Sequence, residues 1–133
     1  MTRSAAQDAA QRLELRVPLH LDNRNTGRGH TWHKPAKARK EIEAILRVLP
    51  HHPVMTPCRI HLTRVLGPRQ GLFDADSLLR GTAKELIDAI VAVGIIPDDG
   101  PKHVHAVTAD QDTSQRETGP ATIVIIETIK GAA

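Results

Sequence analysis

Ser77–Gly94, with the sequence SLLRGTAKELIDAIVAVG, is the stretch that decides the fold. Its apolar residues recur at the spacing of one helical face: Leu79, Ala83, Leu86, Ile87 and Ile90. Asp76 or Ser77 can cap the start of such a helix, and Gly94 stands at the C′ position, where a left-handed residue commonly ends one. The pattern predicts a helix over about residues 77–93 that packs one face against an apolar core.

Four shorter segments around this helix have the patterns of strands. Residues 13–17 and 60–65 alternate apolar with polar side chains, which is typical of a half-buried strand. Residues 102–108 follow a Pro-Asp-Asp-Gly-Pro turn, and residues 122–129, TIVIIETI, are apolar on both faces, as in a buried strand. A second apolar stripe predicts an earlier helix over about residues 31–49, with Thr31 available as its N-cap.

The elements occur in the order β-α-β-α-β-β, which predicts an α+β fold with two helices packed on one mixed sheet. The chain has 133 residues, enough for one hydrophobic core, and no linker long enough to separate two. We expect a polar lead-in over residues 1–12 and one domain over residues 13–133. The order of the strands within the sheet does not follow from these patterns.

The composition is that of a cytoplasmic protein with an aliphatic core. Hydrophobic residues make up 40% of the chain and charged residues 25%, and Phe73 and Trp32 are its aromatic residues. Cys58 is the single cysteine, which excludes an internal disulfide and a cysteine-based zinc cluster. The opening residues, MTRSAAQDAAQRLELR, lack the apolar core of a signal peptide, and no later stretch has the length of a membrane span. We therefore expect the protein in the cytoplasm.

A basic segment extends from Arg24 to Lys40 without an acidic residue. The net charge of +3 and the isoelectric point of about 9.4 permit a nucleic-acid partner without requiring one. The segment is either a solvated helix face or a patch that contacts DNA phosphates. Trp32 either stacks on a base or packs against the helix that it begins. The candidate DNA-binding residues are Arg24, Arg28, Trp32, Lys34, Lys37, Arg39 and Lys40.

Two acidic pairs flank the helix of residues 77–93. Asp74 and Asp76 precede it on one side of an extended backbone, and Asp98 and Asp99 follow it in a turn. Such a helix spans roughly 24 Å at 1.5 Å per residue, so the pairs can meet only if the flanking segments fold back. Converging carboxylates need a cation, and oxygen ligands without cysteine favour Mg²⁺, with Mn²⁺ as the alternative.

Lys84 adds a positive charge to the same region. It lies on the flank of the helix away from the core, where it can hold a scissile phosphate or orient a water molecule. Asp88, four residues later, can fix its position by an ion pair. Each feature also has a simpler explanation, since Asp76 suits a helix cap, Asp98-Asp99-Gly an ordinary turn, and Lys84–Asp88 a surface ion pair.

The histidines allow a zinc site as a less favoured alternative. His103 and His105 share one face of the segment that follows Asp99. Zinc needs a third close ligand, for which His30 and His33 are the candidates. We rank zinc below magnesium because no pattern brings these segments together.

Taken in order, these residues resemble the RusA family of Holliday junction resolvases. The family has an Asp-x-Asp-Asn-Leu motif, followed by a single lysine and a single aspartate. A second motif then precedes a strand, and it consists of a glycine, two hydrophobic residues, any residue and two aspartates. The corresponding residues are Asp74-Ala-Asp76-Ser77-Leu78, Lys84, Asp88 and Gly94-Ile-Ile-Pro-Asp98-Asp99. Asn23-Arg24 and His30-x-Trp32 are similar to the family's N-terminal segment, so the resemblance covers about residues 13–129. Ser77 replaces the usual asparagine, and Lys84 follows Asp76 at a longer spacing.

The resemblance, which is to phage-type members of the family, implies a RusA-like fold and a Mg²⁺-dependent endonuclease. This enzyme would resolve four-way junctions by symmetric nicking of two strands, in recombination and repair and in a phage or prophage setting. The resemblance also implies that Asp74, Asp76 and Asp99 are the catalytic and metal-binding carboxylates and Lys84 the catalytic lysine, with Asp88 and Asp98 in support. We expect a homodimer, because a two-fold symmetric junction needs two related active sites. The alternatives are a nuclease of broader flap and branch specificity and a junction-binding protein that does not cleave, which Ser77 and the lysine spacing favour.

Overall fold

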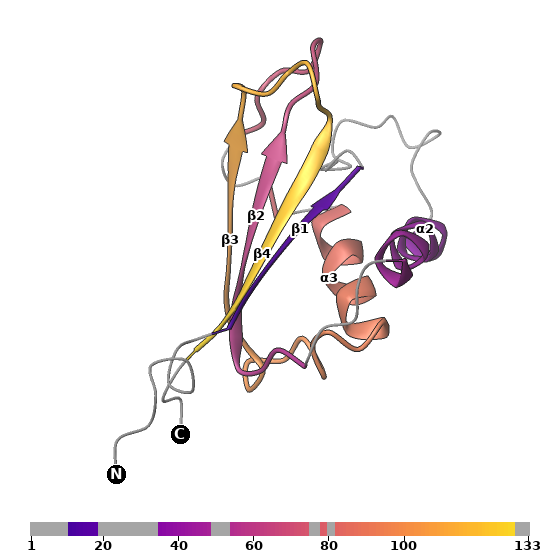
Figure 1. Ribbon diagram of the computed structural model, residues 1–133, viewed down its shortest axis with the longest axis vertical. Coiled ribbons are helices and arrows are strands. Elements are labelled where there is room, and N and C mark those ends of the chain that lie inside the picture. The colour runs from indigo at the N-terminus through magenta and orange to yellow at the C-terminus, as the bar shows by residue number, and fades with distance from the viewer. Residues whose placement is uncertain (1–10, 19–34, 49–53, 75–77, 80–81, 130–133) are drawn as a thin grey trace.

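The sheet has four strands and carries two helices on one face (Figure 1). The computed structural model describes residues 11–18, 35–48, 54–74, 78–79 and 82–129. Its elements are β1 (Arg12–Val17), α2 (Pro35–Arg47), β2 (Cys58–Val65), α3 (Thr82–Ala92), β3 (Val104–Asp112) and β4 (Ala121–Thr128). The predicted α+β class and element order are confirmed.

The strands lie in the order β1-β4-β2-β3, which the sequence patterns left open. β4 pairs antiparallel with both β1 and β2, while β3 pairs parallel with β2 at the opposite edge. Because parallel neighbours need a crossover, α3 lies between β2 and β3 in the chain and packs across the sheet face. Strand β4 is buried on its helix-facing side, through Val124 and Ile126, while Ile123 and Ile125 on its other side are half-buried.

Alternating strand residues and one stripe of each helix form the core. Leu15 of β1 and Leu62 of β2 are buried on the helix side of the sheet, as their period-two pattern predicts. Ile42 of α2 and Ile90 of α3 are buried against them. Each such aliphatic side chain contributes on the order of 1.5–3 kcal/mol by leaving water, so this packing fixes the helices on the sheet. Among the described residues, no helix is long and apolar enough to cross a membrane.

Helix α3 begins later than the sequence predicts. Its first residue is Thr82, and Leu78 and Leu79 lie in a turn before it. The predicted cap at Asp76 or Ser77 is therefore wrong, because neither residue adjoins the helix start. Gly81, directly before Thr82, has a high conformational entropy cost inside a helix, which favours a start after it. Leu79 is consequently not a core residue, and 42% of its surface is exposed.

The end of α3 is a Schellman motif. Gly94 has a φ of 89°, and its N–H donates to the carbonyl of Val91 at 3.0 Å. The N–H of Ile95 donates to the carbonyl of Ile90 at 3.1 Å, which completes the paired bonds of this motif. The predicted glycine at the C′ position is confirmed, and from it the chain turns toward β3.

Strand β3 is displaced from its predicted range of 102–108. It starts at Val104 and continues to Asp112, through residues expected to form a polar loop. Polar side chains suit it because it is an edge strand and bonds its neighbours through them. Asp110, for example, accepts a hydrogen bond from the Thr63 hydroxyl at 2.7 Å. The extension places Gln111 on the helix side of the sheet, beside the chain that leads to Asp74.

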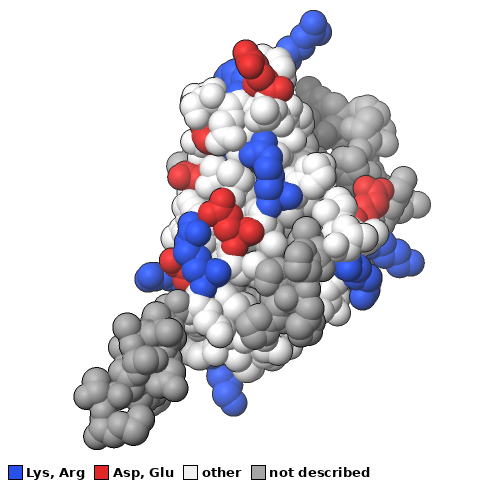
Figure 2. Space-filling view, in the orientation of Figure 1, with Lys and Arg blue, Asp and Glu red and all other residues white. Residues whose placement is uncertain are grey.

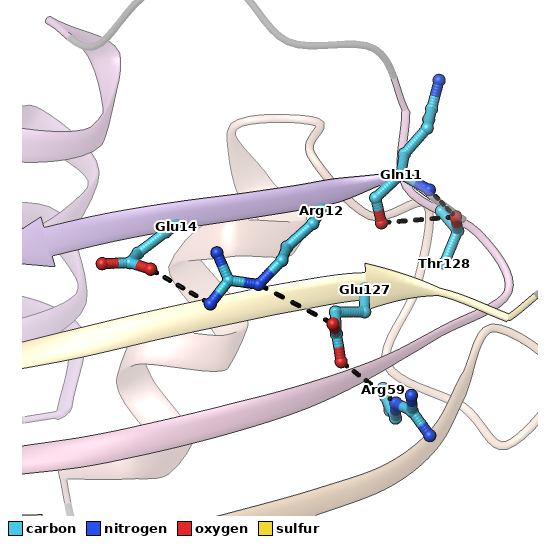
Figure 3. Close-up of polar contacts among 6 residues, drawn as sticks. All are labelled: Gln11, Arg12, Glu14, Arg59, Glu127 and Thr128. Carbon is cyan, nitrogen blue, oxygen red and sulfur yellow. Dashed lines mark hydrogen bonds and ion pairs between the residues drawn. The ribbon is translucent and has the colours of Figure 1, made fainter. Parts of the chain in front are cut away.

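The sheet face opposite the helices is charged. Arg12 of β1 contacts Glu14 at 3.1 Å and Glu127 of β4 at 3.7 Å, and Glu127 also pairs with Arg59 of β2 at 3.2 Å (Figure 3). Next to Arg12, the backbone N–H of Gln11 donates a hydrogen bond to the Thr128 hydroxyl at 2.6 Å. The ion pairs link charges of opposite sign, within β1 and across to β4 and β2, so the charged groups at this end of the face are mutually paired.

Candidate active site

Asp99 of the second acidic pair lies against helix α3, where both line a cavity of about 280 Å³. Its lining includes Lys84 and Asp88 from α3, Asp99 from the following turn and Val107 from β3, with Leu79 and Ile87. Asp99 therefore lies beside the start of α3, although it follows the helix end in the chain. The turn that carries Asp99 is stabilised by the Gly100 carbonyl, which accepts hydrogen bonds from the backbone N–H groups of His103 and Val104, both at 2.9 Å.

Lys84 and Asp88 form the predicted helical ion pair. The Lys84 Nζ lies 3.8 Å from the Asp88 Oδ2, and 72% of the lysine side chain is exposed. Such an exposed pair at this distance contributes no more than about 1 kcal/mol. The ammonium is therefore held loosely at the edge of the cavity, where it can reach an anion in solution.

Asp74 lies farther along the same face of the sheet. It is exposed, and the residue before it, Phe73, is hydrogen-bonded to Gln111 of β3. Gln111 and Val107 face the helices four residues apart, about 13 Å along the strand at 3.3 Å per residue. Asp74 is not among the described residues that line the cavity, but Leu79, five residues later, does line it. The segment that starts at Asp74 thus reaches the cavity within a short length of chain.

The complete acidic constellation extends beyond what the structure describes. Asp76 lies outside the described residues, as does Ser77. Within the described ranges, no three His, Cys, Asp or Glu side chains are close enough together to hold a metal ion. Asp98 is exposed in the turn next to Asp99 and does not line the cavity. The three-carboxylate metal site therefore stays a prediction, for which Asp74 and Asp99 supply exposed oxygen donors.

The basic segment is described only at its end. Arg39 and Lys40 are exposed on α2, and the Arg39 Nε pairs with Glu43 at 3.3 Å. The structure does not describe the side chain of Lys37, nor any part of Arg24, Arg28, Trp32 and Lys34. On the face in view in Figure 2, basic side chains lie among acidic ones rather than in a patch of one sign. DNA binding by this segment thus stays a prediction.

The two described histidines considered for zinc, His103 and His105, do not line the cavity. The Nδ1 of His103 contacts the Thr56 hydroxyl at 2.8 Å, and His105 is exposed. Neither residue lines the cavity that contains Asp99. His30 and His33 lie outside the described residues, so the zinc alternative gains no support here.

Two polar residues near Asp74 escaped the sequence analysis, Arg64 and Gln111. Arg64 of β2 is only 2% exposed and stacks its guanidinium over the Phe73 ring, 3.7 Å from the centroid. Its Nη1 donates to the Gly71 carbonyl at 2.9 Å and to the Gln111 Oε1 at 2.8 Å. The available signal was an arginine at a core position of an alternating strand, after Ile60 and Leu62.

Comparison with known proteins gives no family assignment. No protein-family model and no curated protein matches this sequence.

Proposed function

We propose that this chain is a Mg²⁺-dependent, structure-specific DNA endonuclease with a RusA-like fold, which acts as a cytoplasmic homodimer and resolves four-way junctions in recombination and repair. The observation that carries the proposal is the cavity shared by Lys84, Asp88 and Asp99. These residues belong to two separate motifs of the family resemblance, on either side of the helix end. Their proximity is what a common active site requires.

The carboxylates suit a hard divalent cation. Asp74, Asp76 and Asp99 would hold Mg²⁺, or Mn²⁺ in its place, through oxygen atoms alone. When bound, the ion lowers the pKa of a water molecule and offsets charge on the phosphoryl oxygens. Two of these carboxylates are exposed in the structure, so a phosphate backbone can approach them without rearrangement of the core.

Lys84 has the freedom that a phosphate-binding residue needs. Its long exposed stem projects from the first turn of α3 over the cavity. Asp88 keeps the ammonium near Asp99 before substrate arrives and can release it at small energetic cost. The proposed role is to hold the scissile phosphate or to orient the attacking water.

Cleavage of three labelled DNA substrates tests the proposal. A four-way junction, a flap and a plain duplex are incubated with the protein and Mg²⁺. We expect paired symmetric nicks confined to the junction, with 5′-phosphate and 3′-hydroxyl ends. Equal cutting of the flap would favour the broader nuclease, and junction binding without nicks at any Mg²⁺ concentration would refute both nuclease assignments. That last outcome would favour the non-cleaving protein suggested by Ser77 and the lysine spacing.

Substitutions locate the activity. Asp76→Asn and Asp99→Asn should each reduce cutting by at least about a hundredfold, since losing a key electrostatic group commonly costs 10²–10³ in rate, while junction binding is retained. Asp110→Asn is the matched control, because Asp110 belongs to β3 but bonds Thr63 and His61 on the opposite sheet face. Full cutting by Asp99→Asn would refute the site, as would an equal loss in the control.

A further inference from the structure

We infer that Gln111 is a positioning residue that sets the place of Asp74, and thereby the metal affinity of the proposed site. The inference rests on the proposed function, since it concerns how one of the three carboxylates is held. Gln111 is next to the last residue of β3, and Asp74 ends the described loop after β2. The two meet although they are far apart in the chain.

Gln111 binds the loop as a strand would. Its Oε1 accepts the N–H of Phe73 at 2.8 Å, and its Nε2 donates to the carbonyl of the same residue at 2.9 Å. A side-chain amide is one of the few groups that offers a donor and an acceptor in one plane. The pair fixes both polar groups of Phe73, whose carbonyl carbon is bonded to the Asp74 nitrogen.

Arg64 holds the amide and the loop together. Gln111 and Arg64 are register partners in the parallel β2–β3 pair, and the guanidinium donates to the same Oε1 at 2.8 Å. Arg64 also donates to the Gly71 carbonyl and covers the Phe73 ring. The loop is thus tied at two carbonyls, one amide and one ring. A charged hydrogen bond from the buried arginine orients the glutamine amide toward Phe73.

This arrangement has a consequence for Asp74. Metal affinity depends on how well the ligands are held, and groups that orient ligands commonly change it ten- to a hundredfold. Gln111 acts one residue away from the carboxylate, so the lower end of that range applies. Loss of the amide should leave Asp74 present but poorly placed, which raises the Mg²⁺ concentration required without removing the chemistry.

Gln111→Met tests the inference, because methionine has a similar length and lacks both hydrogen-bonding groups. Three measurements are made on the full chain: hydrogen exchange of the Phe73 amide, Mn²⁺ affinity by electron paramagnetic resonance of the free ion, and the Mg²⁺ dependence of junction cutting. We expect faster exchange, about tenfold weaker Mn²⁺ binding, and a similar rise in the Mg²⁺ concentration for half-maximal cutting. The cutting rate at saturating Mg²⁺ should largely recover.

Gln115→Met is the matched control. Gln115 also bonds through both ends of its amide, accepting from Arg16 at 3.2 Å and donating to Asp112 at 2.8 Å, but in the β3–β4 turn. All three measurements should stay at the wild-type values. Gln111→Glu is an intermediate variant, because glutamate keeps the oxygen that accepts from Phe73 and Arg64 but places a second oxygen against the Phe73 carbonyl. The Mn²⁺ affinity of this variant should lie between those of the wild type and Gln111→Met.

The outcomes separate the inference from the proposed function. Wild-type Mn²⁺ affinity in Gln111→Met, with faster Phe73 exchange, would overturn the inference alone. Equal weakening in the control would also overturn it, because the effect would then be general. If Gln111→Met does not fold, the Mn²⁺ affinity of Gln111→Glu decides, and a wild-type value overturns the inference. A wild-type chain that neither binds Mn²⁺ nor cuts junctions would refute the proposed function, and the inference with it.

Discussion

Gly94→Ala should destabilise the protein by about 1 kcal/mol through its backbone alone. An added Cβ at Gly94 would meet no heavy atom within 4 Å, so crowding contributes nothing. The φ of 89° is the source of the cost, because a left-handed conformation disfavours a non-glycine residue by about 1–2 kcal/mol. The unfolded chain has less conformational entropy with alanine than with glycine, which stabilises the folded state of the variant by about 0.4–1 kcal/mol. The difference corresponds to a fall in Tm of roughly 3–5 °C for a chain of this size.

Urea and thermal unfolding followed by circular dichroism measure this difference. Gly71→Ala is the control, since its Cβ would also meet nothing within 4 Å and its φ lies outside the left-handed range. That variant should be neutral or slightly stabilising, with an unchanged denaturant slope. A Tm for Gly94→Ala equal to that of the wild type would refute the assignment of strain to this backbone position. An equal fall in both variants would show that the cost has another origin.

Two further predictions concern the loops around the sheet. Hydrogen bonds from the Ser114 hydroxyl and amide and from Gln115 hold the pKa of Asp112 below its usual value. The stabilisation from these hydrogen bonds is therefore present above the pKa of Asp112 in the unfolded chain, and it is lost as the pH falls through the lower pKa of the folded protein. Ser114→Ala should raise the Asp112 pKa in an NMR titration. An unchanged pKa would contradict this cause. Gly119→Ala should cost about 1–3 kcal/mol in urea unfolding, because its Cβ would overlap the Leu66 carbonyl, and wild-type stability would contradict the close approach of these two backbones.

Periodicity predicted the elements wherever one face is apolar. The stripes around Ile42 and Ile90 and the alternation around Leu15 and Leu62 put these residues in the core, where the structure has them. The ends of elements were less predictable, because they depend on tertiary contacts. The polar end of β3 is stable as a strand through bonds such as Thr63–Asp110, which cannot be anticipated from local pattern. The start of α3 was predicted too early because Leu79 continues the helical spacing of the apolar residues across Gly81.

The candidate site was predictable in its chemistry and only partly in its geometry. Asp99 and Lys84 were selected by residue type and family resemblance, and the helix between the motifs raised a distance objection that only the fold of the following turn could answer. The structure brings Asp99 and Lys84 to one cavity, whereas Asp74 of the first acidic pair does not line it. The support behind Asp74 could not be predicted, since Gln111 is an ordinary polar residue in sequence and reaches Phe73 only because β3 is longer than its apolar part.

The Lys84–Asp88 pair bears on which of the two roles, cleavage or binding alone, the site can perform. A lysine fixed in a buried ion pair would lose several kcal/mol on leaving its partner, and its placement would then be structural. Here the pair is 3.8 Å long and the Lys84 side chain is 72% exposed, so an incoming phosphate competes with Asp88 at a cost of no more than about 1 kcal/mol. Asp99 in the same cavity would otherwise repel that phosphate. The proposed cation at the carboxylates and the ammonium of Lys84 would together offset this repulsion at the scissile phosphate, which is the charge balance that cleavage requires.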